Sequence, residues 1–199
     1  MLLEIGDASA HIIMSSHNPL NLPDNLPIPV DDGACNHLEG MILPSVFLEA
    51  TNGEKLNIAE ISKQKTIFYF YPRTGIPGKN PPEGWNEIPG ARGCTPQTCN
   101  FRGTYHEFKK LNVSIFGVST QTTEYQAEAV SRLTLPFLML SDKNLELSRY
   151  LQLPTFEVLG VTLIKRITLV ADEGRIIKYF YPIFPPDKNA DEVLKYLKS

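Results

Sequence analysis

Residues 66–72 read TIFYFYP, an unbroken run of aromatic and β-branched side chains that ends at a proline. A run without polar alternation predicts a strand that is buried on both faces of its sheet. Pro72 has no backbone N–H to donate, so we expect the strand to end there. A strand of this kind needs neighbouring strands on each side and helices over both faces, and the rest of the sequence supplies them.

Downstream of Gly93 the sequence alternates between helical and strand patterns. Phe101, Tyr105 and Phe108 recur at helical spacing and predict a helix from Thr95 to about Leu111. The following stretches predict a strand over residues 113–119, a helix over 122–133, a strand over 137–142 and a short helix over 144–151. Strands that alternate with helices indicate βαβ units and parallel strand pairs.

The last forty residues change to a different pattern. Residues 161–183 predict two antiparallel strands about a turn at Glu173 and Gly174. The chain then closes with a helix whose apolar face is formed by Ala190, Val193, Leu194 and Leu197. A β-α-β half followed by a β-β-α half predicts an α/β protein with a thioredoxin-like fold, in which helices flank a mixed central sheet.

The chain divides into an extension and one domain. Residues 1–43 are rich in proline, asparagine and aspartate and show no sustained period, which predicts an N-terminal arm, and Met14 is a second candidate start. The domain is expected over residues 44–199 and begins with a β-hairpin around Asn52 and Gly53. Residues 73–93 form a loop rich in glycine and proline, and loops of this length are often functional.

Composition excludes several classes of protein. The 199 residues carry a formal net charge of −3, so nothing favours binding to a nucleic acid or an anionic membrane surface. No apolar run has the length of a membrane span, and the N-terminus lacks the basic and apolar regions of a signal peptide. Three cysteines do not form a disulfide framework, so we expect a reducing, cytoplasmic setting, where cysteine pairs are commonly catalytic or metal-binding.

Two of those cysteines lie at the predicted helix start, in GARGCTPQTCNFRG (residues 90–103). Unpaired N–H groups at a helix start lower the pKa of a thiol, and Pro96 is tolerated in a first turn, so Cys94 lies at the activated end. In a helix, Cα atoms five residues apart are separated by about 8 to 9 Å. A disulfide needs about 4.4 to 6.8 Å, so bonding of Cys94 to Cys99 requires the helix start to unwind. Spacing alone leaves open that Cys99 is a small packing residue; Cys35, in the arm, is interpreted as incidental.

The motifs together resemble a family. FYFYP, GCTPQTCNFR, IFGVS and KRITLVADEGRI are similar to segments of peroxiredoxins of the bacterioferritin-comigratory-protein (Q-type) class, and the resemblance extends from about Pro44 to the C-terminus. It implies that Cys94 is the peroxidatic cysteine, Cys99 the resolving cysteine on the same helix, Pro72 the proline of the active site and Arg166 its arginine.

The implied chemistry is that of a thiol peroxidase. Cys94 would reduce hydrogen peroxide or an organic hydroperoxide and become a sulfenic acid, and Cys99 would condense with it to a disulfide. A thioredoxin-like or other thiol reductant would then recycle the enzyme. Arg166 would stabilise the thiolate and the polarised peroxide. No cofactor is expected, and the four histidines are not at metal-ligand spacing to the cysteines. A monomer or a homodimer is expected.

One residue departs from the family pattern. The hydroxyl residue expected three positions before the peroxidatic cysteine is Ala91, so Thr74 is the alternative hydroxyl donor for substrate. Gln97 could orient Arg166 from the helix or could face solvent. The departure keeps a second function open, that of a peroxide-responsive redox relay or sensor. A disulfide exchanger is disfavoured because CTPQTC is not a CxxC motif.

Overall fold

The computed structural model describes residues 17–199, so Met14 and the expected absence of a signal peptide lie outside the described residues. Seven strands form one mixed sheet, in the spatial order β2 (Lys55–Asn57), β1 (Phe47–Ala50), β5 (Met139–Ser141), β4 (Ser114–Ser119), β3 (Thr66–Phe70), β8 (Ile167–Asp172) and β9 (Arg175–Phe180). The pairs β3–β4 and β4–β5 are parallel, and the other pairs are antiparallel. This arrangement is the thioredoxin-like mixed sheet that the sequence predicts.

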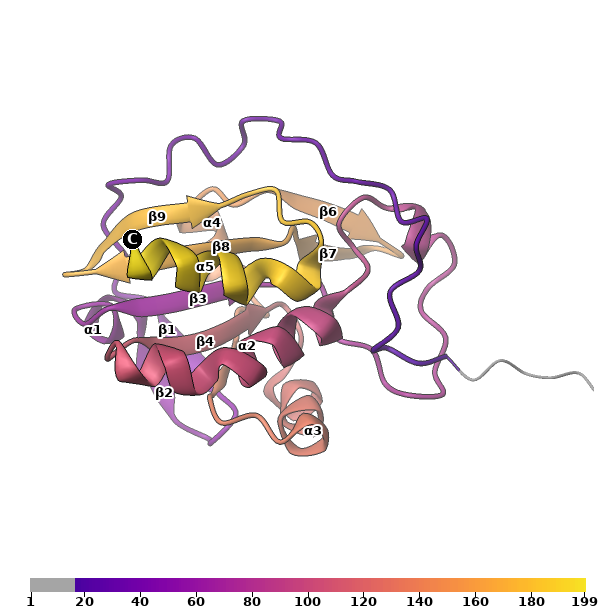
Figure 1. Cartoon of the computed structure of the whole chain (residues 1–199), viewed down its shortest axis with the longest axis horizontal. Coiled ribbons are helices and arrows are strands. Elements are labelled where there is room, and N and C mark those ends of the chain that lie inside the picture. Colours follow the sequence, from indigo (N-terminus) through magenta and orange to yellow (C-terminus); the bar gives the residue numbers. More distant parts are fainter. Residues whose placement is uncertain (1–16) are drawn as a thin grey trace, which may run out of the picture.

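All five residues of the central strand β3 are buried, as their apolar run predicts. Side chains of a strand alternate between faces, so Ile67, Tyr69 and Tyr71 pack in one core cluster, while Phe68 and Phe70 pack in another. The first cluster lies under α2 (Cys94–Lys110), α3 (Thr123–Leu133) and α5 (Asn189–Lys198); the second lies under α1 (Ile58–Ile61) and α4 (Glu146–Tyr150). Helices α2 and α5 lie side by side across the sheet (Figure 1).

Two predicted turns are confirmed. Strands β1 and β2 pair around Asn52 and Gly53, and β8 and β9 pair around Glu173 and Gly174. Both Glu173 and Gly174 have positive φ angles, 49° and 76°, which a tight turn between twisted strands requires.

The sequence analysis predicts one strand over residues 161–172, and this prediction is wrong because the structure has two strands there. Val161–Ile164 is β7, which pairs with β6 (Thr155–Val158) in a separate two-stranded sheet, and the main sheet resumes only at β8. The chain crosses between the two sheets at Lys165 and Arg166. Apolar residues resume directly after these two charged residues, and no glycine or proline marks a turn, so the sequence pattern did not reveal the crossing.

The segment 17–43 has no helix or strand, yet it is packed. Cys35 and Leu38 are fully buried in the core cluster beneath α1 and α4. The segment runs along the β9 edge of the sheet (Figure 1), where Gly40 donates its N–H to the carbonyl of Ile176 at 2.8 Å. The division of the chain into an arm over residues 1–43 and a domain that begins at Pro44 stays a prediction.

Candidate active site at the start of α2

The helix α2 begins at Cys94, with Gly93 as its N-cap. Gly93 has a φ of 107°, and a Cβ atom there would lie 2.3 Å from Pro186 Cγ in the short helix η2 (Pro186–Lys188). Only glycine combines this positive φ with so close an approach. The first helical backbone bond, from Gln97 N to Gly93 O, is 3.0 Å long. The packing of η2 against Gly93 therefore positions the cysteine at the helix start.

Arg166 joins this helix start from the β7–β8 crossing. Its side chain is 4% exposed, and Nη2 lies 3.3 Å from Cys94 Sγ. The same nitrogen donates to the carbonyl oxygens of Gly90, Ala91 and Arg92 at 3.2, 3.3 and 3.1 Å. A buried guanidinium with these partners holds the end of the 73–93 loop and places a positive charge beside the sulfur. Lys165 turns the other way, to Asp32 at 3.1 Å.

A buried polar chain fixes the other side of Arg166. Its Nη1 donates to Gln97 Oε1, and Gln97 Nε2 donates to Asn189 Oδ1 at 3.0 Å. Thr168 Oγ1 donates to the same Asn189 oxygen at 2.7 Å. Gln97 is fully buried, so it faces Arg166 and not solvent. The chain ties Arg166 to α2, α5 and β8, and it restricts the guanidinium to one orientation.

Cys99 lies on the same helix and is half-buried against the core cluster beneath α2. Burial raises the pKa of its thiol, and the charges of Arg102 and Arg132 oppose that effect. All three cysteines are free in this structure. Cys35 packs in the cluster on the opposite face of the sheet from Cys94, and burial raises its pKa from 9.0 to about 12.

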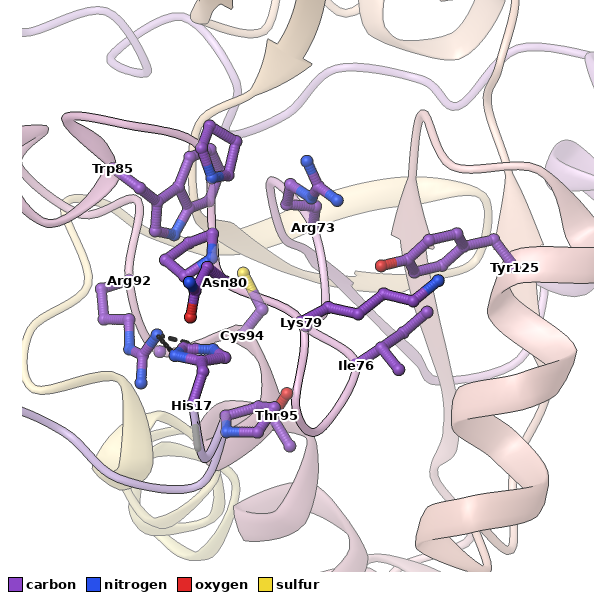
Figure 2. A pocket seen from close by; sticks show the side chains of 15 residues that line it. His17, Arg73, Ile76, Lys79, Asn80, Trp85, Arg92, Cys94, Thr95 and Tyr125 are labelled. Carbon is purple, nitrogen blue, oxygen red and sulfur yellow. Dashed lines mark hydrogen bonds between the residues drawn. The ribbon is translucent and has the colours of Figure 1, made fainter. Parts of the chain in front are cut away.

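A cavity of ≈ 200 Å³ opens over Cys94 (Figure 2). Most of its wall comes from the 73–93 loop, and the rest comes from the first described residues, the helix start and α3. The lining residues are His17, Pro19, Arg73, Gly75, Ile76, Lys79, Asn80, Pro81, Pro82, Trp85, Arg92, Gly93, Cys94, Thr95 and Tyr125. The loop therefore forms a chamber around the Cys94 sulfur, and this chamber accounts for the length of the 73–93 loop.

Pro72 and Thr74 are both buried after β3, but neither lines this cavity. The hydroxyl of Thr74 donates to Gln121 Oε1 at 3.2 Å, and its N–H donates to the same oxygen at 3.0 Å. Tyr125 donates its hydroxyl proton to the carbonyl of Thr74 at 3.0 Å. In this structure Thr74 therefore anchors the start of the loop, and its role toward substrate stays a prediction.

The structure adds residues that the sequence analysis missed. Asn189 and Thr168 complete the chain behind Arg166, and Thr95 lines the cavity beside Cys94. Thr95 directly follows Cys94 in the sequence, so its place beside the cysteine could have been predicted. Nothing local marks Asn189, which is 92 positions from Gln97.

Two other kinds of feature are absent from the described residues. Within residues 17–199, no group of three histidine, cysteine, aspartate or glutamate side chains is placed to hold a metal ion. Over the same range, no helix combines the length and the apolar composition needed to cross a bilayer.

The chain is similar to a known protein family and to individual proteins over most of its length. A family model described as Redoxin matches residues 38–194. Peroxiredoxin Q, chloroplastic, from Populus jackii is 30% identical over 162 residues, which cover 81% of this chain and 68% of the relative. The protein of the same name from Gentiana triflora is 28% identical over 186 residues, covering 90% and 78%.

Solved structures share the fold. Peroxidoxin BcpB from Mycobacterium tuberculosis superposes with a TM-score of 0.66 at 23% identity and covers 81% of this chain and 97% of its own. Peroxiredoxin Q from Xanthomonas campestris gives 0.63 at 20% identity, covering 87% and 96%. The chain belongs to the redoxin family, and within that family it is a peroxiredoxin of the Q type.

Proposed function

We propose that this protein is a thiol-dependent peroxidase in which Cys94 reduces hydroperoxides and Cys99 resolves the product. The observation that carries the proposal is the contact of 3.3 Å between Arg166 Nη2 and Cys94 Sγ, at a helix start that opens on a cavity. The guanidinium and the helix start both favour negative charge on the sulfur. They also face the position where negative charge develops on a peroxide oxygen.

The reaction begins with attack of the Cys94 thiolate on one peroxide oxygen. The O–O bond breaks, an S–O bond forms, and the departing oxygen takes a proton and leaves as water or an alcohol. The sulfur is oxidised to sulfenic acid as the peroxide is reduced by two electrons. Arg166 stabilises the charge on both oxygens during transfer, and the Gln97–Asn189 chain keeps its guanidinium aimed at the sulfur.

The second step joins two cysteines of one helix. Cys99 attacks the Cys94 sulfenic acid, a disulfide forms and water leaves. Because the folded helix separates the two Cα atoms by about 8 to 9 Å, its first turns must unwind. Unwinding also exposes Cys99, whose pKa burial raises in the folded helix. An external dithiol of the thioredoxin type then supplies two electrons and restores both thiols.

The experiment is peroxide consumption by the purified protein, coupled to a thioredoxin, its reductase and NADPH. The wild-type protein is expected to turn over many times, and Cys94→Ser to lose essentially all turnover. Cys99→Ser is expected to be oxidised once and then to stop with this reductant. Retained turnover in Cys94→Ser would refute the proposal.

A redox relay or sensor is the second candidate. Ala91 stands where the family pattern has a hydroxyl, and the Thr74 hydroxyl is already bonded to Gln121. Without a hydroxyl donor to substrate, peroxide reduction would be slow, and stoichiometric oxidation would serve as a signal. The rate of peroxide consumption in the assay above separates the candidates, because a relay needs only stoichiometric oxidation, whereas an enzyme turns over many times.

The remaining expectations belong to the same proposal. A cytoplasmic location stays a prediction, and the plant relatives are named as chloroplastic proteins; fractionation of cells that produce the protein tests it. A monomer or homodimer is proposed, and light scattering of the reduced and oxidised protein tests this.

A further inference from the structure

The cavity over Cys94 carries a marked excess of positive charge. Arg73, Lys79 and Arg92 line it, and none of the described residues in its wall is an aspartate or a glutamate. Figure 2 shows these side chains arranged around the opening above the sulfur. All three come from the 73–93 loop that forms most of the chamber.

Within the described part of the chain, no carboxylate forms an ion pair with these cations. The ion pairs among residues 17–199 involve neither Arg73, Lys79 nor Arg92. Arg92 donates to the ring of His17 at 3.1 Å, and burial together with the charge of Arg92 lowers the pKa of that histidine. An imidazole ring has no carboxylate charge with which to neutralise the arginine.

Arg92 also has an unused donor. Its Nη2 donates to the carbonyls of Asn18 and Asn21 at 3.0 and 2.8 Å. Its Nε is buried and has no hydrogen-bond partner among the described residues. A buried donor without a partner is costly unless a ligand satisfies it.

The chamber also has an apolar wall and limited room. Ile76, Pro81 and Trp85 line it, and the Arg73 guanidinium lies 6.0 Å from the centre of the Trp85 ring. A water molecule occupies about 30 Å³ in the liquid, so ≈ 200 Å³ exceeds what hydrogen peroxide needs and admits a compact organic molecule.

We propose that the preferred substrate is a compact organic hydroperoxide that carries a carboxylate. Its peroxide group lies at Cys94, its short carbon skeleton lies against Trp85, and its carboxylate is bound by the cations of the 73–93 loop. A cavity lined by one sign of charge concentrates an oppositely charged substrate and raises its rate of association. This inference rests on the proposed peroxidase function and names its substrate class.

The test compares 3-hydroperoxy-3-methylbutanoic acid with its methyl ester, which has the same reacting group without the charge. At low ionic strength kcat/KM for the acid is expected to exceed that for the ester by about tenfold. The ratio is expected to fall with added salt, because salt screens exposed charges. Lys79→Gln and Arg73→Gln are each expected to reduce the ratio. The matched control is Lys143→Gln. The Lys143 ammonium pairs with Glu49 at 3.0 Å and does not line the cavity, so this variant should leave the ratio of acid to ester unchanged.

The outcomes separate this inference from the function on which it rests. If acid and ester are reduced at equal rates at every salt concentration, or if the control variant lowers the ratio as much as Lys79→Gln does, the substrate class is wrong and the peroxidase function stands. If neither compound nor hydrogen peroxide is reduced catalytically, the peroxidase function itself fails.

A separate observation concerns the missing hydroxyl at Ala91. Thr95 is 2% exposed and lines the cavity beside Cys94, and its Oγ1 is buried without a hydrogen-bond partner among residues 17–199. We infer that the Thr95 hydroxyl donates a hydrogen bond to the bound peroxide and so replaces the hydroxyl that Ala91 lacks. The Thr74 hydroxyl, by contrast, already has its partner in Gln121.

The test uses Thr95→Val, which keeps the shape, and Thr95→Ser, which keeps the hydroxyl. Loss of one hydrogen bond to substrate is expected to lower kcat/KM for hydrogen peroxide about tenfold in Thr95→Val. Thr95→Ser is expected to retain most of the wild-type value. Urea unfolding should show no loss of stability in Thr95→Val, because the hydroxyl has no partner in the free protein. Wild-type kinetics in Thr95→Val, or an equal loss in Thr95→Ser, would overturn the assignment.

Discussion

Removal of the Tyr69 hydroxyl should make the start of α2 unwind more readily. Tyr69 is fully buried in β3, and its hydroxyl donates to Thr98 Oγ1 at 3.2 Å. Thr98 lies between Cys94 and Cys99, in the part of the helix that must open before a disulfide forms. The ring of Tyr69 stacks on Phe101 at 4.4 Å, and Tyr69→Phe preserves that contact.

The size of the effect follows from this single bond. A buried hydrogen bond between neutral groups contributes about 1 kcal/mol. Its loss weakens the closed helix relative to the open one, so the population of the open form should rise about fivefold. Because opening precedes the reaction of Cys99, the disulfide should form about fivefold faster in Tyr69→Phe. The free energy of global unfolding should fall by about 1 kcal/mol.

The assay is a rapid-mixing experiment. Reduced protein is mixed with peroxide, quenched with acid at a series of times and alkylated, and the disulfide is counted by mass spectrometry. Trp85 lines the Cys94 cavity and is the only tryptophan, so its fluorescence follows the same reaction continuously. The control is Tyr181→Phe, which removes a hydroxyl bonded to Asp32 at 2.9 Å, away from α2. The reasoning is refuted if Tyr69→Phe lowers stability as expected but forms the disulfide no faster than the control.

Three further predictions concern the helix start, Cys35 and the chain behind the arginine. Gly93→Ala should lower the free energy of unfolding by about 2 kcal/mol in urea titrations, because a Cβ there meets Pro186 at 2.3 Å and the φ is positive; unchanged stability would show that η2 moves freely. Cys35→Ala should retain peroxidase turnover. Because the raised pKa of Cys35 keeps its thiol protonated when folded, the stability that it contributes is present below pH 9 and is lost as pH rises toward about 12, by up to about 1.4 kcal/mol per pH unit. The stability difference between wild type and this variant should therefore shrink over that window, and a constant difference contradicts the reasoning. Gln97→Leu should lower kcat/KM for peroxide at least about tenfold, because Arg166 loses a buried partner; wild-type kinetics would assign the orientation of Arg166 to the loop carbonyls alone.

The parts of this structure that sequence could predict are those encoded by local pattern. The buried run of β3, the helix start at Cys94 and the turn at Glu173 each depend on residues that are close together in the chain. The place of Arg166 in the site was also predictable. A charged side chain within an apolar strand pattern is costly to bury unless it has partners, so it indicates a functional contact. Lys165 and Arg166 lie between β7 and β8, and they contact different partners, Asp32 and Cys94.

The parts that sequence could not predict depend on contacts between distant segments. The β6–β7 hairpin was hidden because only Lys165 and Arg166 separate its second strand from β8, with no glycine or proline to mark a turn. The burial of Cys35 and Leu38 comes from packing against the sheet edge, which no local period encodes. The bond of Gln97 to Asn189 joins α2 to α5, and the cavity over Cys94 exists only because the 73–93 loop folds back over it.

The central claim is that Cys94 is oxidised by peroxide and then bonded to Cys99. Trypsin cleaves after Arg92 and Arg102, so one peptide, GCTPQTCNFR, carries both cysteines, and Cys35 lies in another. After one equivalent of peroxide, we predict that this peptide resists alkylation and is lighter by two hydrogen atoms, while Cys35 remains fully alkylated. A Cys94 link to Cys35 or to a second chain, or a Cys94 that stays alkylated after peroxide, would contradict the account.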